Sequence, residues 1–421
     1  MDYPEALAYL DRVGSQRAEP SLHRIDALLT ALGEPQKKLK FVHIAGTNGK
    51  GSCAAMLASI LRAAGYRTGL YTSPYLYRFT ERMQIDGKEI GAEALARCAE
   101  AVKDKADKMD EAPTPFELIT AAALLWFAAE RCDIVVLEAG LGGRFDATNV
   151  ISAPECCVIM NIGLDHTALL GSTPEQIAAE KAGIIKPNVP CVVYSQPESV
   201  MAVFRARCAQ LSAPLVTPDF DSIRSEFDSL EGQVFSYRGS QYALSLPGAH
   251  QRRNAASALE AALILRARGW RIDQDALEHG LYAASWPGRF ELCGDEPPFI
   301  VDGGHNPQCA EAVCESLLHY FPDSRRVLLL GVLRDKDYAL MAGILDRAAD
   351  EYVCTAPASE RALSAEELAE QLKKYGKQIS VCPSVSDAVY TARERAGADG
   401  IVCAFGSVYL AGAVRYELGL Y

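Results

Sequence analysis

A glycine-rich stretch with one lysine and two hydroxyl side chains is the part of this 421-residue sequence whose spacing best suits chemistry. It reads Gly46, Thr47, Asn48, Gly49, Lys50, Gly51 and Ser52. The mostly apolar residues 41–45 before it predict a buried strand, and residues 53–64 after it predict a helix that stops at Gly65. In this setting, backbone N–H groups and the dipole at a helix N-terminus bind phosphate.

The side chains of this loop fit a nucleotide. Lys50 would bridge phosphate oxygens, and the hydroxyl of Ser52 would face a Mg²⁺ ion. The loop departs from the standard phosphate-binding pattern, because Gly51 separates the lysine from the serine and the first two glycines are closer together than usual. The alternative is a glycine-rich turn that binds no nucleotide.

Polar residues follow three further predicted strands, at the ends where open α/β sheets bind their ligands. Glu138 ends the apolar strand of residues 133–138 and is placed to hold Mg²⁺; otherwise it caps a turn or forms an ion pair. Arg144 and Asp146 come soon after three glycines, and they either orient a substrate or pair with each other. His166 follows the strand of residues 156–162, so we predict a metal ligand there, although a lone histidine is more often structural.

The last of these groups lies in the C-terminal third of the chain. Asp302 ends the strand of residues 299–302 and could accept a hydrogen bond from a ribose hydroxyl or a base amino group. His305 could contact a second substrate, and Ser407 follows another strand in a similar way. Lys181, by its pattern alone, is an exposed lysine on a helix.

The elements that must position these residues alternate between strand and helix, which predicts an α/β protein. We expect a mostly parallel sheet of the phosphate-binding-loop type in a domain of residues 1–290, with a small antiparallel region at residues 222–246. A smaller Rossmann-like α/β domain follows at residues 298–421. Helices are predicted at residues 3–13 and 21–32, no strand is predicted at residues 83–87, and a hinge is expected between residues 286 and 298.

Composition narrows the class of protein. The net charge of −12 argues against a nucleic-acid partner, which would need a basic face. No apolar run approaches the ~20 residues that span a bilayer, so no membrane partner is expected. The 13 cysteines form no CxxC pair, which favours free thiols in a reducing, cytoplasmic compartment over a zinc site.

Twelve motifs together resemble the folylpolyglutamate synthase and dihydrofolate synthase family, and more broadly the Mur ligases. They occur in the family's order over nearly the whole chain: GTNGKGS (46–52), TSPYL (72–76), ERMQIDG (81–87), FELITAAAL (116–124), EAGLGGRFDATN (138–149), IGLDHTALLG (162–171), EKAGIIKP (180–187), GAHQRRNA (248–255), WPGRFE (286–291), DGGHNP (302–307), LGVLRDKD (330–337) and FGSVYLAG (405–412).

The resemblance implies roles for individual residues. It assigns Mg²⁺, with two ions expected, to Ser73, Glu138 and His166, beside the Ser52 hydroxyl. Lys181 matches a lysine that is carbamylated in the family, which reverses the interpretation from its pattern. The other implied roles are ATP contacts at Asn254, Arg289 and Asp302, folate contacts at Tyr75, Phe116 and Glu117, and glutamate contacts at His305 and Ser407.

The implied reaction is ATP-dependent amide formation between the terminal carboxylate of a folate and L-glutamate, through an acyl phosphate, in a protein expected to be a monomer. Whether dihydropteroate is also a substrate stays open. A Mur-type peptidoglycan precursor ligase is less favoured, because only 45 residues precede the phosphate-binding loop. A nucleotide-dependent switch protein would have no need of the second polar site at Asp302 and His305.

Overall fold

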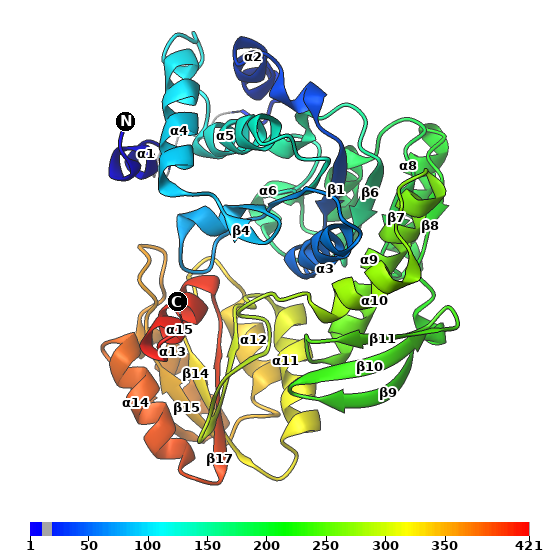
Figure 1. Cartoon of the computed structure of the whole chain (residues 1–421). Helices are drawn as coiled ribbons and strands as arrows, with labels where there is room; N and C mark the ends of the chain where they lie inside the picture. The colour runs from blue at the N-terminus through cyan, green and yellow to red at the C-terminus, as the bar shows by residue number, and fades with distance from the viewer. Residues whose placement is uncertain (11–18, 421) are drawn as a thin grey trace. The chain divides into compact units, whose positions relative to one another are not determined.

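The computed structural model describes residues 1–10 and 19–420, which fall into two compact units (Figure 1). The first unit comprises residues 1–223 and 253–284, and the second comprises residues 224–252 and 285–421. The expected domains, 1–290 and 298–421, remain a prediction. They differ from these units chiefly in residues 224–252, which the contacts group with the second unit.

An eight-stranded sheet forms the centre of the first unit, in the order β4-β3-β2-β5-β1-β6-β7-β8. Its strands are β1 (Phe41–Ala45), β2 (Thr68–Tyr71), β3 (Met83–Ile85), β4 (Lys88–Glu89), β5 (Ile134–Glu138), β6 (Cys156–Ile159), β7 (Cys191–Val193) and β8 (Leu215–Val216). Neighbouring strands from β2 to β8 in this order are parallel, and only the pairs β2–β3 and β3–β4 are antiparallel. The predicted mostly parallel sheet is therefore confirmed.

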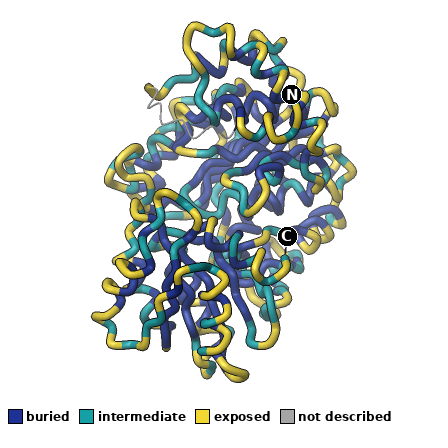
Figure 2. The backbone as a smooth tube through the Cα atoms, turned by 90° about the vertical axis from the view of Figure 1, so that its left-hand side faces the viewer, coloured by how far each residue is buried: buried dark blue, intermediate teal, exposed yellow. Residues whose placement is uncertain are grey.

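Every residue of β1 and β5 is buried, although successive side chains of a strand point to opposite faces of the sheet. Both faces of this sheet are therefore covered by helices. The α-helices of the unit are α1 (Tyr3–Leu10), α2 (His23–Ala31), α3 (Lys50–Ala63), α4 (Ala92–Ala106), α5 (Pro115–Ala129), α6 (Thr167–Leu170), α7 (Pro174–Lys181), α8 (Glu198–Gln210), α9 (Ala249–Ala267, from its fifth residue) and α10 (Gln274–Tyr282). One core joins α1, α2, α4 and α5 to Phe41 of β1, Tyr71 of β2, and Val135 and Leu137 of β5. Figure 2 shows the buried strands enclosed by more exposed loops and helix faces.

Several predicted boundaries differ from the structure. Residues 83–89 form β3 and β4, a short antiparallel hairpin that the sequence did not predict. Helix α3 begins at Lys50, three residues before the predicted start, so Lys50 to Ser52 form the first turn of the helix and not part of the loop. The predicted helix of residues 3–13 is observed as α1 as far as Leu10, and its last three residues lie outside the described residues.

The second unit contains a six-stranded sheet in the order β12-β13-β17-β14-β15-β16. Its strands are β12 (Glu291–Asp295), β13 (Pro298–Asp302), β14 (Arg325–Leu330), β15 (Glu351–Cys354), β16 (Gln378–Val381) and β17 (Gly400–Phe405). The helices between and after them are α11 (Pro307–Tyr320), α12 (Tyr338–Leu345), α13 (Ala365–Leu372), α14 (Val385–Ala396) and α15 (Val408–Glu417). All pairs except β12–β13 are parallel, which confirms the predicted second α/β sheet. The stretch between residues 286 and 298, where a hinge is expected, contains β12 and the turn that joins it to β13.

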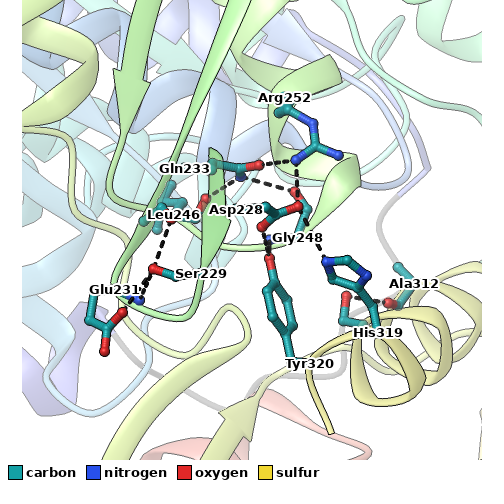
Figure 3. A network of polar contacts seen from close by, with 12 residues as sticks. Asp228, Ser229, Glu231, Gln233, Leu246, Gly248, Arg252, Ala312, His319 and Tyr320 are labelled. Carbon is teal, nitrogen blue, oxygen red and sulfur yellow. Dashed lines mark hydrogen bonds and ion pairs between the residues drawn. The ribbon is translucent and has the colours of Figure 1, made fainter. Parts of the chain in front are cut away.

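The predicted antiparallel region is a three-stranded sheet of β9 (Arg224–Ser229), β10 (Gly232–Tyr237) and β11 (Ser240–Leu244). Polar contacts connect it to α11 (Figure 3). Asp228 accepts hydrogen bonds from Tyr320 and from Arg252, the latter at 2.8 Å, and the Tyr320 hydroxyl accepts one from the Gly248 N–H at 3.0 Å. The same Nη1 of Arg252 also donates to Oε1 of Gln233 at 2.5 Å. Because Asp228 and Arg252 are both largely buried, their charges compensate each other there.

None of the helices formed by the described residues combines the length and the apolar character that crossing a membrane requires.

Candidate active site

The phosphate-binding loop is shaped by the backbone of Gly49, the residue that precedes α3. Its φ of 81° is left-handed, a conformation that residues with a Cβ rarely adopt. A Cβ at this position would also lie 2.6 Å from Oδ1 of Asn254 on α9. The loop therefore requires glycine for two reasons, and it brings Asn254, expected to contact ATP, directly against the loop.

The backbone that follows β6 holds the other side of this loop. The N–H groups of Thr47 and Asn48 donate to the carbonyl of Asn161 at 2.8 and 3.2 Å. The Thr47 hydroxyl donates to the carbonyl of Gly163 and accepts from its N–H, both at 3.1 Å. Hydrogen bonds consequently hold the loop and the residues before His166 together.

Lys50, Ser73 and Glu138 come together at the carboxyl ends of β1, β2 and β5. Lys50 Nζ lies 3.9 Å from Glu138 Oε1 and donates to the carbonyl of Thr47 at 3.1 Å. The backbone N–H of Ser73 donates to Glu138 Oε2 at 3.2 Å. Glu138 is 4% exposed and Ser52, on the first turn of α3, is 3% exposed. One carboxylate and two hydroxyls are hard oxygen donors, and this donor set fits Mg²⁺ that keeps several water ligands.

Within residues 1–10 and 19–420, no three side chains of the His, Cys, Asp and Glu types are grouped so that they could hold a metal ion. The expected set of metal ligands therefore depends on the serine hydroxyls as well as on Glu138.

Lys181 is buried, so the prediction of an exposed helix lysine from its pattern is wrong. It ends α7 and is 4% exposed, because the backbone of the loop after β5 packs directly on it. A Cβ on Gly143 would lie 2.9 Å from the Cα of Lys181. Burial, and after it the nearby charge of Lys50, lower the pKa of Lys181 to about 7, against the opposing effect of Asp165 and Asp146.

His166 begins α6 with a left-handed backbone, at a φ of 50°. Its side chain is 39% exposed, and its Nε2 lies 3.9 Å from Oδ1 of Asp165. Asp165 also acts electrostatically on Lys181, which places the His166 segment on the Lys181 side of the site. A metal role for His166 stays a prediction.

The loop after β5 is held together by Asp146. This carboxylate is 6% exposed and accepts hydrogen bonds from the N–H groups of Leu141 at 2.8 Å and Thr148 at 3.0 Å. The Thr148 hydroxyl also donates to it and lies 2.8 Å from Nε2 of His43, a buried residue of β1. Arg144 does not pair with Asp146: it lies 3.7 Å from Glu180.

Phe116 and Glu117, which the family resemblance places on the folate side, occupy the first turn of α5. The ring of Phe116 lies against Gly140, where a Cβ would come within 2.5 Å of it. Glu117 forms a capping box with Thr114 and an ion pair with Arg24 at 3.2 Å. Glu117 thus has a structural role in addition to its expected substrate contact.

Tyr75 lies in the loop after Ser73 and takes part in an aromatic cluster. Its ring centroid is 6.0 Å from that of Phe79, and the guanidinium of Arg82 lies 5.0 Å from the Tyr75 centroid. The sequence singled out Tyr75 but not Arg82, although Arg82 belongs to the ERMQIDG motif.

In the second unit, the residues after β13 and β17 are adjacent because these strands are parallel neighbours, with Asp302 opposite Phe405. Asp302 is 6% exposed and accepts from the N–H groups of Phe290 at 2.8 Å and Gly304 at 2.7 Å. Burial raises the pKa of Asp302, while the nearby charge of Arg289 lowers it. The expected ATP contacts Arg289 and Asp302 are therefore neighbours.

His305 and Ser407 lie on the same two loops, which the Gly406 N–H joins by donating to the Gly304 carbonyl at 3.2 Å. A ring nitrogen of His305 lies 3.1 Å from the carbonyl of Gly303. Ser407 is 1% exposed and caps α15 by accepting from the N–H of Leu410 at 3.0 Å. The structure brings these residues together, while their contact with glutamate remains a prediction.

Profiles of known protein families match both halves of the chain. Residues 44–262 match the Mur ligase middle domain, and residues 288–408 match the Mur ligase glutamate ligase domain.

Among curated proteins, the dihydrofolate synthase/folylpolyglutamate synthase of Bacillus subtilis is 37% identical over 95% of each chain. Among solved structures, the Mycobacterium tuberculosis folylpolyglutamate synthase complexed with ADP is 34% identical, with a TM-score of 0.90 over 99% of each chain. The Escherichia coli FolC protein in complex with DHPP and ADP is 33% identical, with a TM-score of 0.88 over 100% of this chain and 98% of the other. This chain therefore belongs to the folylpolyglutamate synthase and dihydrofolate synthase family, built from Mur ligase domains.

Proposed function

We propose that this protein joins L-glutamate to the terminal carboxylate of a folate in an ATP-dependent ligation that releases ADP and phosphate. The observation that carries the proposal is the convergence of Lys50, Glu138 and Lys181 at one edge of the first sheet. Lys50 beside a helix N-terminus, with Glu138 placed to hold a metal and Lys181 to carry a carbamate, suits phosphoryl transfer, where positioning and charge neutralisation matter more than covalent help.

The reaction has two steps. A carboxylate oxygen of the folate attacks the γ-phosphorus of ATP, the bond to the β,γ-bridging oxygen breaks, and an acyl phosphate and ADP result. The amine of glutamate then attacks the acyl carbon, phosphate leaves, and the amine loses a proton. The first step concentrates negative charge beside the N–H groups at the start of α3 and beside Lys50, so these groups stabilise its transition state.

Different residues of the first unit would bind ATP and the metal. We assign the ATP phosphates to the loop from Gly46 to Ser52, and a further ATP contact to Asn254, which lies against Gly49. Ser52, Ser73 and Glu138 would hold Mg²⁺, with His166 as a further ligand and two ions in total. The metal would neutralise phosphate charge when bound.

We assign Lys181 the role of a carbamate-bearing residue. A neutral amine is the form that reacts with carbon dioxide, and the lowered pKa of about 7 leaves much of Lys181 neutral at physiological pH. The resulting carbamate would replace a buried cation by an anion beside Lys50, which favours the charge balance of the site. A crystal structure with a free ammonium at this position, at neutral pH with bicarbonate present, would contradict this assignment.

In the second unit, Arg289 and Asp302 would contact ATP, while His305 and Ser407 would contact glutamate. Tyr75, Phe116, Glu117, Arg144 and Asp146 of the first unit would shape the folate site. For Glu117 and Asp146 this role would be partly indirect, since both already accept hydrogen bonds from the backbone around them.

The decisive experiment is an assay of ADP release with ATP, tetrahydrofolate and glutamate, with mass spectrometry of the product. We expect ADP release that depends on both other substrates and a product heavier by one glutamyl residue. ADP release stimulated by a UDP-linked muropeptide and not by tetrahydrofolate would refute the proposal.

A second activity, the ligation of glutamate to dihydropteroate, is favoured by the Bacillus subtilis relative, whose name includes both synthase activities. Supplying dihydropteroate in place of tetrahydrofolate tests it, and the absence of dihydrofolate from the products would exclude it. We further propose that the protein is a monomer and that it is cytoplasmic, the location being supported by 13 cysteines that are all free thiols.

A further inference from the structure

Arg82 is a half-buried cation that stacks on aromatic rings and, among the described residues, pairs with no carboxylate. Its guanidinium lies 5.0 Å from the ring centroid of Tyr75 and 5.6 Å from that of Phe79. Its Nε is buried and has no hydrogen-bond partner, and among residues 1–10 and 19–420 it forms no ion pair. Removing a cation from water without an anion is unfavourable, so such an arrangement is typical of a site that an anionic ligand completes.

The position of Arg82 in the sheet places it near the proposed reaction site. Its carbonyl accepts a hydrogen bond from the Thr72 N–H at 3.0 Å, so it lies across from the end of β2. The next residue, Ser73, donates its N–H to Glu138 at 3.2 Å. Burial raises the pKa of Tyr71, an effect that Arg82 opposes and that Asp146 and Glu138 reinforce, so all three charges act on the same buried phenol.

We propose that Arg82 binds a carboxylate of the folate substrate, and specifically the one that does not react. The inference rests on the proposed function, in which the folate ends in a glutamate with two carboxylates, one of which becomes the new amide. A planar guanidinium donates two parallel hydrogen bonds to a carboxylate, and the rings of Tyr75 and Phe79 hold the Arg82 side chain for this geometry.

The distinction between the two carboxylates follows from charge. The reacting carboxylate loses its negative charge to the acyl phosphate, so an arginine bound to it would stabilise the substrate more than the transition state. The other carboxylate keeps its charge throughout the reaction. An arginine bound there contributes equally to substrate and transition state, and its loss raises KM while kcat stays unchanged.

Arg78 provides a matched control because it lies four residues earlier in the same loop and its guanidinium already pairs with Glu89 at 2.6 Å. The test compares tetrahydrofolate with an analogue whose non-reacting carboxylate is a carboxamide, using the wild-type protein, Arg82→Gln, Arg82→Lys and Arg78→Gln. The quantity measured is the ratio of kcat/KM for the two folates, from initial rates of ADP release.

We expect the wild-type protein to prefer the carboxylate by about 10- to 100-fold, as the loss of a charge-assisted hydrogen bond implies. Arg82→Gln should abolish the preference through a higher KM for tetrahydrofolate, Arg82→Lys should retain part of it, and Arg78→Gln should retain it fully. Thermal unfolding and the KM for ATP show whether each variant remains folded.

Two results would overturn the inference: an unchanged KM in Arg82→Gln, or an equal rise in KM for both folates, which is the result of a structural role. A wild-type protein that releases no ADP with tetrahydrofolate and glutamate refutes the proposed function itself, and this outcome is distinct from the other two. If Arg82→Gln does not fold, Arg82→Lys decides the test. A preference for the carboxylate below that of Arg78→Gln supports the inference, and an equal preference overturns it.

Discussion

The carboxyl ends of the two parallel sheets carry polar residues in different electrostatic states. At the edge of the first sheet, Lys50 and the buried Lys181 lie close enough to lower the pKa of Lys181, and the Lys50 ammonium lies 3.9 Å from Glu138. At the edge of the second sheet, each oxygen of Asp302 accepts a backbone N–H, and Ser407 caps a helix. The first edge is therefore under electrostatic strain that a phosphate would relieve, whereas at the second edge backbone hydrogen bonds and Arg289 oppose the effect of burial on Asp302 before any ligand binds.

This difference separates residues whose replacement should impair chemistry from residues whose replacement should impair folding. Groups at the first edge cost stability and contribute to the reaction, a trade-off that is common at active sites. Groups at the second edge contribute to stability as well, so their effects on substrate binding must be measured apart from their effects on folding.

The largest effect is expected for Glu138→Ala. Removing this carboxylate leaves Lys50 without its anionic neighbour and removes a proposed metal ligand, so kcat should fall by about 10⁴-fold or more. ADP release measures the loss, and circular dichroism checks the fold. Glu155→Ala is the control, since Glu155 is a largely buried glutamate that pairs with Lys40 and Arg268 elsewhere in the same unit. Near-normal turnover in Glu138→Ala would remove the contrast between the two edges.

The strain at the first edge predicts a pH-dependent stability. In the unfolded chain Lys181 titrates near 10.5, and in the folded protein near 7. Between these values the unfolded state binds more protons, so the free energy of unfolding rises with pH by about 1.4 kcal/mol per unit. Below pH 7 the lysine is charged in both states and its full penalty remains.

Lys181→Met should therefore be more stable than the wild-type protein, by several kcal/mol at pH 6 and by less at pH 9. Urea unfolding in buffers freed of carbon dioxide measures the difference. Equal stability of the two proteins at pH 6 would show that Lys181 is not strained.

The tight contact at Gly49 predicts an intermediate effect. Gly49→Ala should lower the free energy of unfolding by about 3 kcal/mol, from the left-handed backbone and the collision with Asn254 together. Gly65→Ala, at a similar φ of 86° with open space around it, should lose only about 1 kcal/mol. Adding Asn254→Ala to Gly49→Ala should recover the steric part, and no recovery would mean that Asn254 does not press on the loop.

The smallest effect is expected at the second edge, for Ser407→Ala. Loss of the helix cap should cost about 1 kcal/mol of stability. Ser384 caps α14 in the same way by accepting from the N–H of Asp387 at 3.1 Å, so Ser384→Ala is a control with a similar cost. Only Ser407→Ala should also raise the KM for glutamate. An equal KM in the two variants would reduce Ser407 to a structural role.

The sequence predicted the residues at both edges because each follows a buried strand, a local pattern that parallel sheets repeat. It misplaced Lys181 because the burial of that side chain depends on Gly143, 38 positions earlier in the chain. It missed β3 and β4 because such short strands exist only through pairing, of β3 with β2 and of β4 with β3. The contact of Asn254 with Gly49 joins residues 205 positions apart, and no local pattern reports it.

The eight-stranded sheet ends on both sides in a strand of two residues, β4 and β8. An open sheet normally offers its outer strands as a template on which another chain can add a strand. Strands this short present few free backbone N–H and C=O groups, so an added strand would gain very few hydrogen bonds. The sheet that carries the phosphate-binding loop is thus protected at both borders against growth into a larger aggregate.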